Sequence, residues 1–518
     1  MINAPQSFHD KAQGQIINPI AKLYISFSKE ITEGTYFTLN QSILNGDDLL
    51  GASEDNPLQL WDLYVYQDYS DRLTNISIER SIEFPYNTQS AMADFVLDNF
   101  DKYFSPRSNS PIAIYNIPQR PIKIFAGFIG ETTIPQFVGL TEDVPDTSTN
   151  NATAEIHAQD FLSAIYNQVL VDTIIARDVT TDVLLAKIVE QFGVLPGQYD
   201  FEKGDNVIPF AFFDVGNKAG DAIKDIVQAE GGKFWLDEQG ILRFAKRYSL
   251  QTAPVISVDD YSIVSIDSRK DENIVNKIVI SCDLREVQEY QSVYSKAPSA
   301  TSSTGDMWVI GANDSITRDC KLADPCYEIV NPTQGKQSTV SWFTAVDSYG
   351  NIIDTGITAT GTLSTTAYTI TFTNANNFPV KINEIQLWGE PAKVYDHLEY
   401  EAEDTDSVEK YGEQILTISN NKFFQSYESA RNFARYVLRE HANYIGGVRM
   451  SVKGDPSLQL NDIITINNED YAGEYRIDTI KWELGAGTFE TDIDAHKIEL
   501  VTYFTLNESQ LNGTHVLA

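Results

Sequence analysis

Residues 76–84 have the sequence Ile76-Ser77-Ile78-Glu79-Arg80-Ser81-Ile82-Glu83-Phe84, in which apolar and polar side chains alternate almost without a break. Successive side chains of a β-strand point to opposite faces, so this alternation is typical of a strand with one buried and one exposed face. Residues 60–66 are also β-like in character. These stretches predict β-strands and, with their neighbours, a mainly β protein.

Further strands are expected on the C-terminal side, at residues 122–127, 136–140 and 154–158. Proline and glycine separate these strands, and both mark turns because proline fixes φ and glycine tolerates positive φ. Short strands in regular succession suit a β-barrel or a β-sandwich. On the N-terminal side, residues 1–33 are expected to form an arm that enters a strand.

A small α/β unit is expected next. One helix is predicted with Thr180 as candidate N-cap, because apolar residues recur at the i, i+3, i+4, i+7 spacing: Leu185, Ile188, Val189 and Phe192. A second helix is predicted from Lys218 to Glu230, closed by Gly231-Gly232. Two strands around a glycine-containing turn follow over residues 233–244.

Residues 306–392 are rich in Thr, Ser and Asn, have alternating apolar positions and contain no convincing helical pattern. We expect an inserted β-sandwich here, entered through a linker over residues 295–305. An amphipathic helix capped by Ser426 is predicted after it, and the buried face should comprise Ala430, Phe433, Ala434, Val437 and Leu438. Strands return at residues 448–452, 463–466 and 475–478.

Three arginines repeat every four residues on another face of that helix: Arg431, Arg435 and Arg439. A contact with a partner or with nucleic acid is one interpretation of this basic row. We favour the other, a solvated face whose arginines pair with nearby acids.

Length and composition limit the class of protein. A chain of 518 residues is too long for one ordinary core, so three or four domains are expected. A hydrophobic content of 42% is that of a folded protein. No stretch approaches the roughly 20 apolar residues that span a bilayer. The start, Met1-Ile2-Asn3-Ala4-Pro5, does not resemble an export signal, which predicts folding in the cytoplasm.

The formal net charge is −35, from 38 basic and 73 acidic residues. Proteins bind DNA mainly by neutralising phosphates with Lys and Arg, so tight DNA binding by the whole surface is not expected. An acidic surface also suits a pore through which DNA slides without sticking, because like charges repel. Plain solubility is the simpler explanation of the same charge.

The chain has three cysteines, Cys282, Cys320 and Cys326. An odd number without CxxC pairs or nearby histidines argues against both a disulfide framework and a structural zinc site. We expect ordinary reduced thiols, although Cys320 and Cys326 are close enough in sequence to pair after oxidation.

One motif occurs twice. Residues 35–46 recur almost unchanged as residues 502–513, and the shared positions include Tyr36, Phe37, Leu39, Asn45 and Gly46 in the first copy and Tyr503, Phe504, Leu506, Asn512 and Gly513 in the second. Each copy has the pattern of a short strand that ends in Asn-Gly, a strong turn signal. One hypothesis is an assembly element that adds as a strand to a sheet edge. A surface hairpin without a partner is the alternative.

Catalytic and cofactor motifs are not recognisable in the sequence. It has no phosphate-binding loop, no GxSxG elbow, no HExxH helix and no EF-hand loop. The six histidines are scattered, and adjacent acids such as Asp237-Glu238 are expected by chance among 73 carboxylates. Trp61, Tyr64, Tyr66 and Tyr69 suit a β-core or a subunit interface better than a sugar platform. We therefore predict no enzyme activity, no cofactor and no metal.

Three segments in this order resemble the tail-hub or tail-tip proteins of long-tailed phages, a family that includes baseplate hubs. The first is residues 93–106 with 120–124 and 137–140, the second is residues 219–244, and the third is the helix at 426–439 followed by residues 454–464. Together they cover most of the chain outside the expected sandwich. The order of the segments is more specific than any one of them.

The resemblance implies a mainly β fold with α+β parts: two tube-type β-barrel domains, a small α/β domain and an inserted β-sandwich. The domains would be 1–165, the N-terminal arm and first barrel; 166–245, the α/β domain; 246–290 and 400–500, the two parts of the second barrel; 291–399, the sandwich; and 501–518, the C-terminal motif. No catalytic residues follow from it, because hubs of this family act mechanically.

The resemblance also implies a function. A homotrimer would form a pseudo-sixfold ring at the virion tail tip, assembled in the host cytoplasm. The ring would join the tail tube or distal tail protein to a fibre or spike, with the tape measure protein as a further partner, and gate DNA passage without sequence-specific binding. The alternatives are a carbohydrate-binding surface adhesin of β-sandwich type and a tail-associated cell-wall hydrolase.

Overall fold

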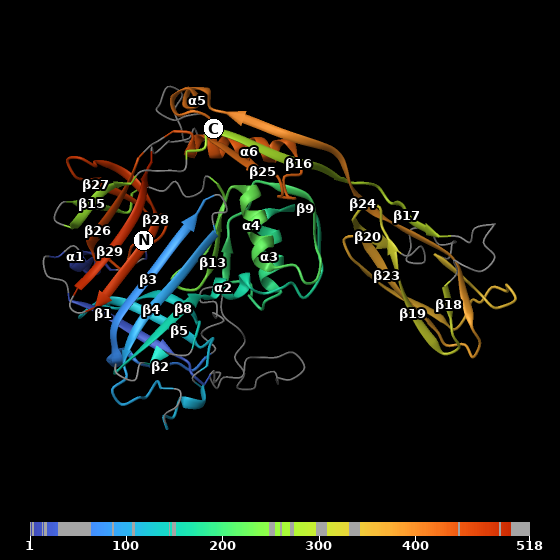
Figure 1. The fold of residues 1–518 in the computed structure, drawn as a ribbon, viewed down its shortest axis with the longest axis horizontal. Helices are drawn as coiled ribbons and strands as arrows, with labels where there is room; N and C mark the ends of the chain where they lie inside the picture. The colour runs from blue at the N-terminus through green and yellow to red at the C-terminus, as the bar shows by residue number, and fades with distance from the viewer. Residues whose placement is uncertain are drawn as a thin grey trace.

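The structure is a computed structural model (Figure 1). It describes Ile2, Gly14 and residues 5–12, 18–28, 64–84, 88–105, 109–115, 117–143, 146–147, 152–247, 254–259, 262–269, 274–296, 308–330, 342–443, 446–485 and 488–498. Strands dominate it and helices are few, so the expected mainly β fold with α+β parts is confirmed.

The first barrel-like sheet, called barrel 1, curls around one apolar core. Its main strands are β1 (Pro19–Ile25), β3 (Leu73–Glu83), β4 (Thr88–Asp98), β5 (Pro121–Phe128), β6 (Ile134–Thr141) and β8 (Thr153–Asp160). Shorter elements complete it: α1 (Gln6–Ala12), β2 (Gln67–Asp68), η2 (Ser70–Arg72), η3 (Ala113–Tyr115) and β7 (Asp146–Thr147). Phe8 of α1 is fully buried in this core, 5.0 Å from Phe128 between ring centroids. The N-terminal arm is therefore part of the barrel.

The predicted strand at residues 76–84 is β3, and its alternation has the expected cause. Ile76 and Ile78 face the core with about 1% or less of their surface exposed, whereas Glu79 is exposed. Arg80 departs from the simple pattern, because it lies on the core side and is only 4% exposed.

The second barrel-like sheet, called barrel 2, comprises β14 (Ile256–Asp259), β15 (Ile263–Arg269), β26 (Gly447–Lys453), β27 (Ile463–Asn467), β28 (Gly473–Gly485) and β29 (Thr488–Lys497). Its core is mainly aliphatic, with Val448, Ile464 and Ile493 fully buried. In Figure 1, β28 and β29 lie beside β3 and β4.

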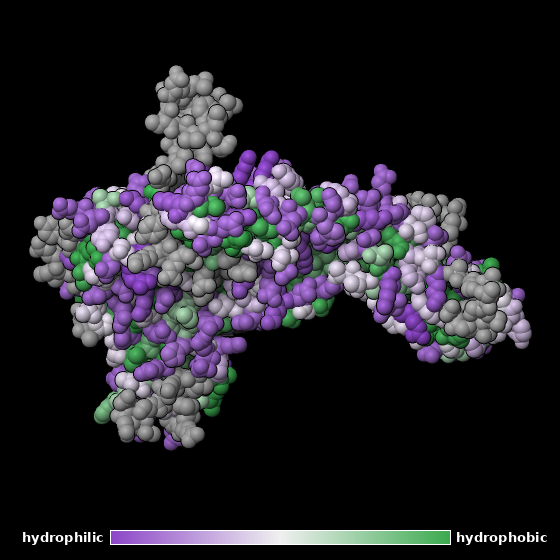
Figure 2. All heavy atoms as spheres, turned by 45° about the horizontal axis from the view of Figure 1, so that its top comes forward, coloured by the Kyte–Doolittle hydropathy of each residue, from purple (hydrophilic) through white to green (hydrophobic). Residues whose placement is uncertain are grey.

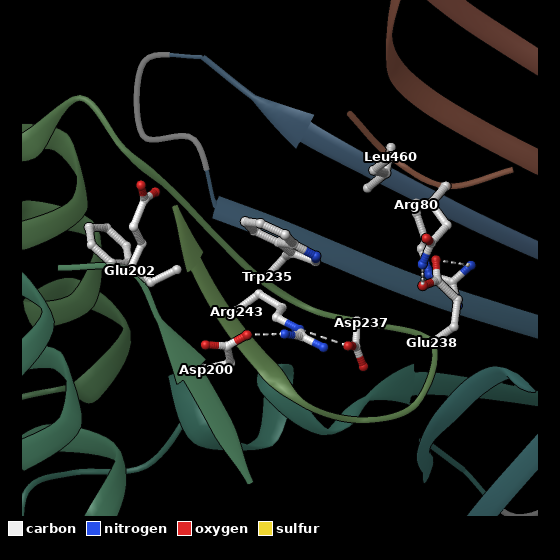
Figure 3. Close-up of a pocket in the computed structure, with 10 residues that line it drawn as sticks. Arg80, Asp200, Glu202, Trp235, Asp237, Glu238, Arg243 and Leu460 are labelled. Carbon is white, nitrogen blue, oxygen red and sulfur yellow. Dashed lines mark hydrogen bonds and ion pairs between the residues drawn. The ribbon is translucent and has the colours of Figure 1, made fainter. Parts of the chain in front are cut away.

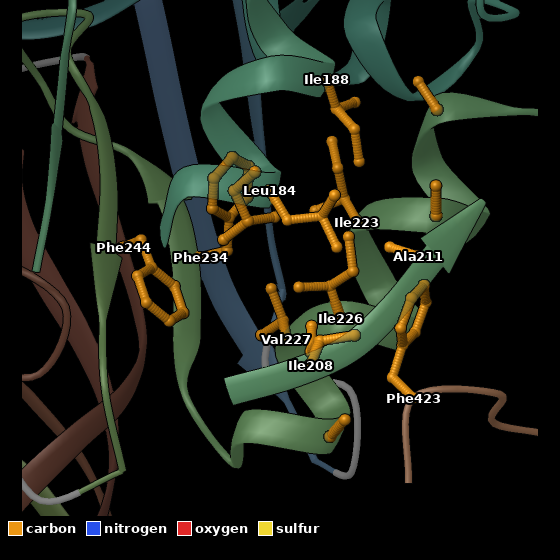
Figure 4. Packing of buried hydrophobic residues seen from close by; sticks show 14 of the residues in the cluster. Leu184, Ile188, Ile208, Ala211, Ile223, Ile226, Val227, Phe234, Phe244 and Phe423 are labelled. Carbon is orange, nitrogen blue, oxygen red and sulfur yellow. The ribbon is translucent and has the colours of Figure 1, made fainter. Parts of the chain in front are cut away.

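A central α/β unit packs against both barrels. Its elements are α2 (Phe161–Tyr166), β9 (Ile174–Thr180), α3 (Thr181–Glu190), β10 (Tyr199–Phe201), β11 (Val207–Phe213), α4 (Ala219–Glu230), β12 (Lys233–Leu236) and β13 (Leu242–Ala245). Figure 4 shows how Leu184, Ile223 and Phe234 pack together in its core. Both predicted helices exist. Gly231 ends α4 with a φ of 67°, and Thr180 is the N-cap of α3, although its side chain accepts no capping bond.

The predicted extent of the second barrel needs one correction. β16 (Lys277–Val287), α5 (Thr405–Tyr411), β25 (Ile415–Ile418) and α6 (Tyr427–His441) were expected to belong to it, but β16 pairs with β24 (Val380–Glu403) and β25. Ile278, Ile280 and Phe433 lie in the same apolar cluster as α4. Strand periodicity predicts β16, but its pairing partner is chosen by this shared core, which a strand pattern does not reveal.

The inserted β-sandwich has two sheets around a separate core. β17 (Gln291–Lys296), β18 (Trp308–Ile310), β20 (Cys326–Val330) and β21 (Phe343–Val346) pair with β24, and β19 (Asp314–Lys321) and β22 (Ile357–Leu363) flank β23 (Ala367–Asn374). Trp342 and Phe372 stack in that core with ring centroids 6.0 Å apart. Figure 1 shows the sandwich projecting from the body on the long pair β16–β24.

Candidate functional site: a continuous sheet across two barrels

The two barrels repeat one strand order. Numbered in chain order, the strands of barrel 1 are β1, β3, β4, β5, β6 and β8, and those of barrel 2 are β14, β15, β26, β27, β28 and β29. In both, the first strand pairs with the fourth, the fourth with the fifth, the fifth with the sixth, the sixth with the third and the third with the second. They differ in one pairing, since β1–β5 is antiparallel and β14–β27 parallel.

The correspondence extends to single backbone hydrogen bonds. Gln119 and Asn461 each precede the fourth strand and have φ values of 60° and 66°. The Gln119 N–H donates to the Thr141 carbonyl at 2.7 Å, and the Asn461 N–H donates to the Ile477 carbonyl at 3.0 Å. In return, the Thr141 N–H donates to the Arg120 carbonyl and the Ile477 N–H donates to the Asp462 carbonyl, both at 3.0 Å. The two barrels are thus equivalent residue by residue here.

The second strand shows a further correspondence. The β3–β4 register shifts between Leu73 and Asn75, and the β15–β26 register shifts between Ile263 and Ser265. An extra residue in an antiparallel pair bends the strand and increases its twist. Both barrels therefore bend at the same point. The long segment from β16 to α6 is inserted after β15, where barrel 1 has the short connection from β3 to β4.

The barrels join edge to edge where β3 pairs with β28, from Ser81 opposite Thr479 to Asn75 opposite Gly485. We call this pairing the internal seam. On its buried side Trp482 is 2% exposed and meets Phe489 edge-on, with centroids 5.8 Å apart. Both aromatic residues come from barrel 2 and belong to the core of barrel 1. Barrel 2 therefore contributes side chains to the core of barrel 1, so the seam joins the barrels by packing as well as by strand pairing.

A pocket of about 460 Å³ lies where barrel 1, barrel 2 and the central unit meet. Arg80 of β3 forms a buried ion pair with Glu238 at 3.6 Å, and Gln459 of barrel 2 also donates to Glu238. Figure 3 shows Arg80 and Glu238 together at one end of this pocket, which Trp235 also lines. This ion pair links barrel 1 to the central unit, and the side chains of Arg80 and Glu238 are each only 5% exposed. Removing either charge would therefore leave the other buried and uncompensated.

The adjacent acids Asp237 and Glu238 are bound to arginines. Asp237 accepts from the Arg243 guanidinium at 2.9 Å and from the Ile241 N–H at 2.8 Å, so it organises the turn between β12 and β13. Burial raises the pKa of Asp237. Asp200 pairs with the other side of the Arg243 guanidinium (Figure 3). Asp200, Asp237 and Glu238 are therefore each bound to an arginine.

The face of the joined sheet opposite the cores is polar. Cross-strand neighbours continue across β8, β4, β3, β28, β29 and β26, as in the row His157, Asp94, Ser77, Glu483, Glu490 and Lys453. We call the face that contains this row the seam face. Its acidic residues are Glu79, Asp94, Asp98, Glu155, Asp267, Glu483, Glu490, Asp492 and Asp494. Its basic residues are fewer: Arg269, Arg449, Lys453 and Lys481.

Ion pairs on the seam face cross between strands, and His157–Asp94 and Arg449–Asp494 are two of them. His157 Nδ1 lies 2.6 Å from Asp94, which raises the pKa of the imidazole. Arg449 makes a two-pronged contact with Asp494 at 2.8 and 3.0 Å, although 71% of the arginine side chain is exposed. Figure 2 shows hydrophilic residues over most of the visible surface, interrupted by small hydrophobic patches.

The candidate assembly motif cannot be placed, because both copies, residues 35–46 and 502–513, lie outside the described residues. Trp61 also lies outside them. Tyr69 is 7% exposed and contacts Phe27 and Phe104, with centroids 5.6 and 5.5 Å away, so it serves the core of barrel 1 and not a sugar platform.

Other sequence predictions can be located. Arg431 pairs with Glu428 at 3.6 Å and Arg439 with Glu440 at 3.7 Å, which supports the solvated, paired interpretation of the basic row on α6. Cys320 and Cys326 are buried free thiols, and burial raises their pKa to about 11 and about 12. Over the described residues, no group of His, Cys, Asp and Glu is arranged to hold a metal ion. The same residues include no helix long and apolar enough to cross a bilayer.

Comparisons of sequence find no counterpart: neither a protein-family model nor a curated protein matches this chain. Solved structures do. The chain is similar to the 43 kDa tail protein of prophage MuSo2 from Shewanella oneidensis, with 12% identity and a TM-score of 0.45 over 83% of this chain and 95% of that one.

Two further structures are similar over comparable lengths. One is a tail protein from Neisseria meningitidis, with 9% identity and a TM-score of 0.46 over 84% of this chain and 94% of that one. The other is a prophage tail protein from Listeria monocytogenes, with 10% identity and a TM-score of 0.41 over 85% and 94%. All three are named as tail proteins.

Proposed function

We propose that this chain is a non-enzymatic structural hub at the distal end of a phage tail, where three copies form a ring. The repeated strand order carries the proposal. Two equivalent barrels in each chain give six equivalent positions in a trimer. Such a ring presents sixfold geometry to a tail tube or distal tail ring and threefold geometry to a fibre or spike.

The internal seam supports the same arrangement. Adjacent barrels within the chain are already joined into one sheet by the β3–β28 pairing, with Trp482 of barrel 2 buried in the core of barrel 1. Repeating that lateral contact between chains would close a ring of barrels around a central opening. The hub would act in the virion after assembly in the host cytoplasm, with the tape measure protein as a further neighbour.

The charge of the seam face supports its assignment to the inner wall of the ring. Carboxylates outnumber basic groups on this face. DNA phosphates are repelled by such a wall, so DNA would pass with little friction and without sequence-specific contacts. Gating by the ring requires two packings of the subunits, and a trigger must contact one packing better than the other.

The test is the native mass of the full chain by light scattering, with imaging of the particles. A mass of three times 58.0 kDa and rings with six lobes are expected, for the chain alone or with a distal tail ring added. A chain that stays monomeric in both conditions would refute the hub. Glycan binding by such a monomer would favour the adhesin, and clearing of peptidoglycan in a zymogram would favour the hydrolase.

A further inference from the structure

The internal seam is a template for a contact between chains. In it, the second strand of barrel 1 (β3) pairs with the part of the fifth strand of barrel 2 (β28) that extends beyond the fourth strand. β27 covers β28 only up to Arg476, and β3 takes over from Thr479. The contact therefore needs a free edge on a second strand and a free extension of a fifth strand.

Among the described strands, barrel 2 has a free edge on its second strand, and barrel 1 has a free extension of its fifth strand. The second strand of barrel 2 is β15, which within the described residues pairs with β26 alone. The fifth strand of barrel 1 is β6, whose pairing on the β5 side ends at Thr141. Beyond it, Glu142 and β7 are bonded to β8, and no described strand pairs with their other edge. One chain thus offers both halves of a second seam, at the two ends of the joined sheet.

The register of this second seam follows from the equivalence of the barrels. Asp267 pairs with Arg449 in barrel 2, and Ser77 pairs with Asp94 at the equivalent place in barrel 1. Asp267 is therefore equivalent to Ser77, and the next residue, Ser268, is equivalent to Ile78. On the other side, Thr147 pairs with Ala154. In barrel 2, Trp482 pairs with Thr491, which is the residue equivalent to Ala154. Thr147 is therefore equivalent to Trp482.

In the internal seam Ile78 lies opposite Trp482. The second seam therefore places position 268 opposite position 147, and position 269 opposite position 146. The latter pair combines an arginine, whose guanidinium also donates to Asp478 of its own chain at 3.0 Å, with an aspartate, whereas the internal seam has Glu79 opposite Lys481. The residue types remain of opposite charge with the signs exchanged.

We infer that β15 of one copy pairs antiparallel with the edge formed by residues 141–143 and β7 (Asp146–Thr147) of the next copy. This inference rests on the proposed ring and names the surface that closes it. Unpaired strand edges invite pairing with another chain, and a head-to-tail contact between two different edges forms a closed ring when its rotation repeats a whole number of times. The seam face would then continue without a break from one chain to the next.

The competing partner for the β15 edge is the repeated motif of residues 35–46 and 502–513, because its sequence also has the pattern of a strand. A chain that ends at residue 500 removes one copy of the motif. If β15 pairs with a neighbouring chain, the truncated chain still forms the contact.

The test is a disulfide across the second seam, in the double variant Ser268→Cys and Thr147→Cys of the full chain. Facing residues of paired strands lie within the distance that a disulfide spans. Mild oxidation should give a covalent trimer on a denaturing gel, because each chain supplies both halves. The matched control, Val264→Cys with Thr147→Cys, is four residues out of register, about 13 Å along the strand, and should not cross-link.

Hydrogen exchange of the unmodified chain gives a second readout. Within residues 263–269, the amides that point away from β26 should exchange at least tenfold more slowly in the ring than in the monomer. A trimer by mass that neither cross-links at 268–147 nor protects residues 263–269 overturns the inference and leaves the hub intact. Loss of protection in the chain ending at residue 500 assigns the edge to the terminal motif and likewise overturns it. Failure to form any ring refutes the proposed function itself.

Discussion

Gln119 and Asn461 occupy the same position in the two barrels, and both have a left-handed backbone, with φ of 60° and 66°. Each begins the fourth strand of its barrel by donating its N–H to the fifth strand. A left-handed backbone costs a residue other than glycine roughly 1–2 kcal/mol. Because it occurs at two equivalent positions, we infer that both barrels need this left-handed turn to begin the fourth strand.

Replacing Gln119 tests this turn. Because Gln119 is exposed, glycine should preserve or slightly raise stability, whereas the β-branched Gln119→Val should lower it by about 1–2 kcal/mol. The measurement is the urea midpoint for unfolding of the chain. The same two substitutions at Lys22, which lies in β1 with an ordinary strand backbone, should have the opposite order. The same order at both sites would contradict the argument.

Asp160 should make the stability of barrel 1 depend on pH. Its carboxylate is 3% exposed, accepts from the N–H groups of Ser163 and Ala91 at 3.0 and 3.2 Å, and has a pKa raised to about 6, chiefly by burial. Between pH 4 and 6 the folded chain retains a proton that the unfolded chain has lost. The stability that this group contributes therefore falls as pH rises, by about 3 kcal/mol over that window.

The check is the difference in unfolding free energy between the wild type and Asp160→Asn at pH 4, 5, 6 and 7. Asparagine does not titrate, so the wild type should lose stability relative to the variant up to pH 6 and then level off. A difference that stays constant with pH would show that Asp160 titrates normally.

Glu230 should be essential to the central unit. It is fully buried, accepts from the Thr181 hydroxyl at 2.7 Å and from the Asn206 N–H at 3.0 Å, and pairs with buried Arg247 at 3.4 Å. Glu230→Gln leaves the Arg247 charge uncompensated, which should cost about 3–5 kcal/mol in unfolding free energy.

The double variant Glu230→Gln with Arg247→Met should recover much of that loss, because it removes both charges. Glu428→Gln breaks the exposed pair with Arg431 and should change stability by about 0.5 kcal/mol or less. Equal losses for Glu230→Gln and Glu428→Gln would contradict the importance of burial.

Reversing charge on the seam face should create DNA binding. The wild type is expected not to retard a DNA duplex in 0.1 M salt, whereas the triple variant Glu79→Lys, Glu483→Lys and Glu490→Lys should bind it with an affinity that falls steeply with salt. A gel-shift series over salt concentration measures both. Three exposed acids of the sandwich provide a control with the same change in charge: Asp314→Lys, Glu328→Lys and Asp354→Lys. Equal binding by both triple variants would attribute the effect to net charge and not to the seam face.

Local patterns in the sequence predicted many elements correctly. The N-cap Ser426 accepts from the Ser429 N–H at 3.1 Å, and Ala430, Phe433, Ala434 and Val437 of α6 are buried as expected. Gly231 closes α4. Caps, helix periodicity and strand alternation depend on residues close together in the chain, so a sequence reveals them.

The seam could not be predicted in the same way. No pattern in residues 473–485 indicates that β28 leaves β27 for β3, a strand some 400 residues earlier. Gln119 and Asn461 carry no glycine signal for their left-handed backbone. Arg80 also breaks the alternation of β3 because its partner, Glu238, comes from the central unit.

The sequence by itself determined the mainly β character of the chain, its helices, its inserted sandwich and its acidic charge, because these follow from local periodicity and composition. The tertiary structure decided which strands became neighbours: the repeated order of the two barrels, the β3–β28 seam and the seam face with its row of carboxylates. Strand pairing satisfies backbone groups that are the same in every residue, so the choice of partner depends on how side chains of distant segments pack together and cannot be inferred from one strand alone.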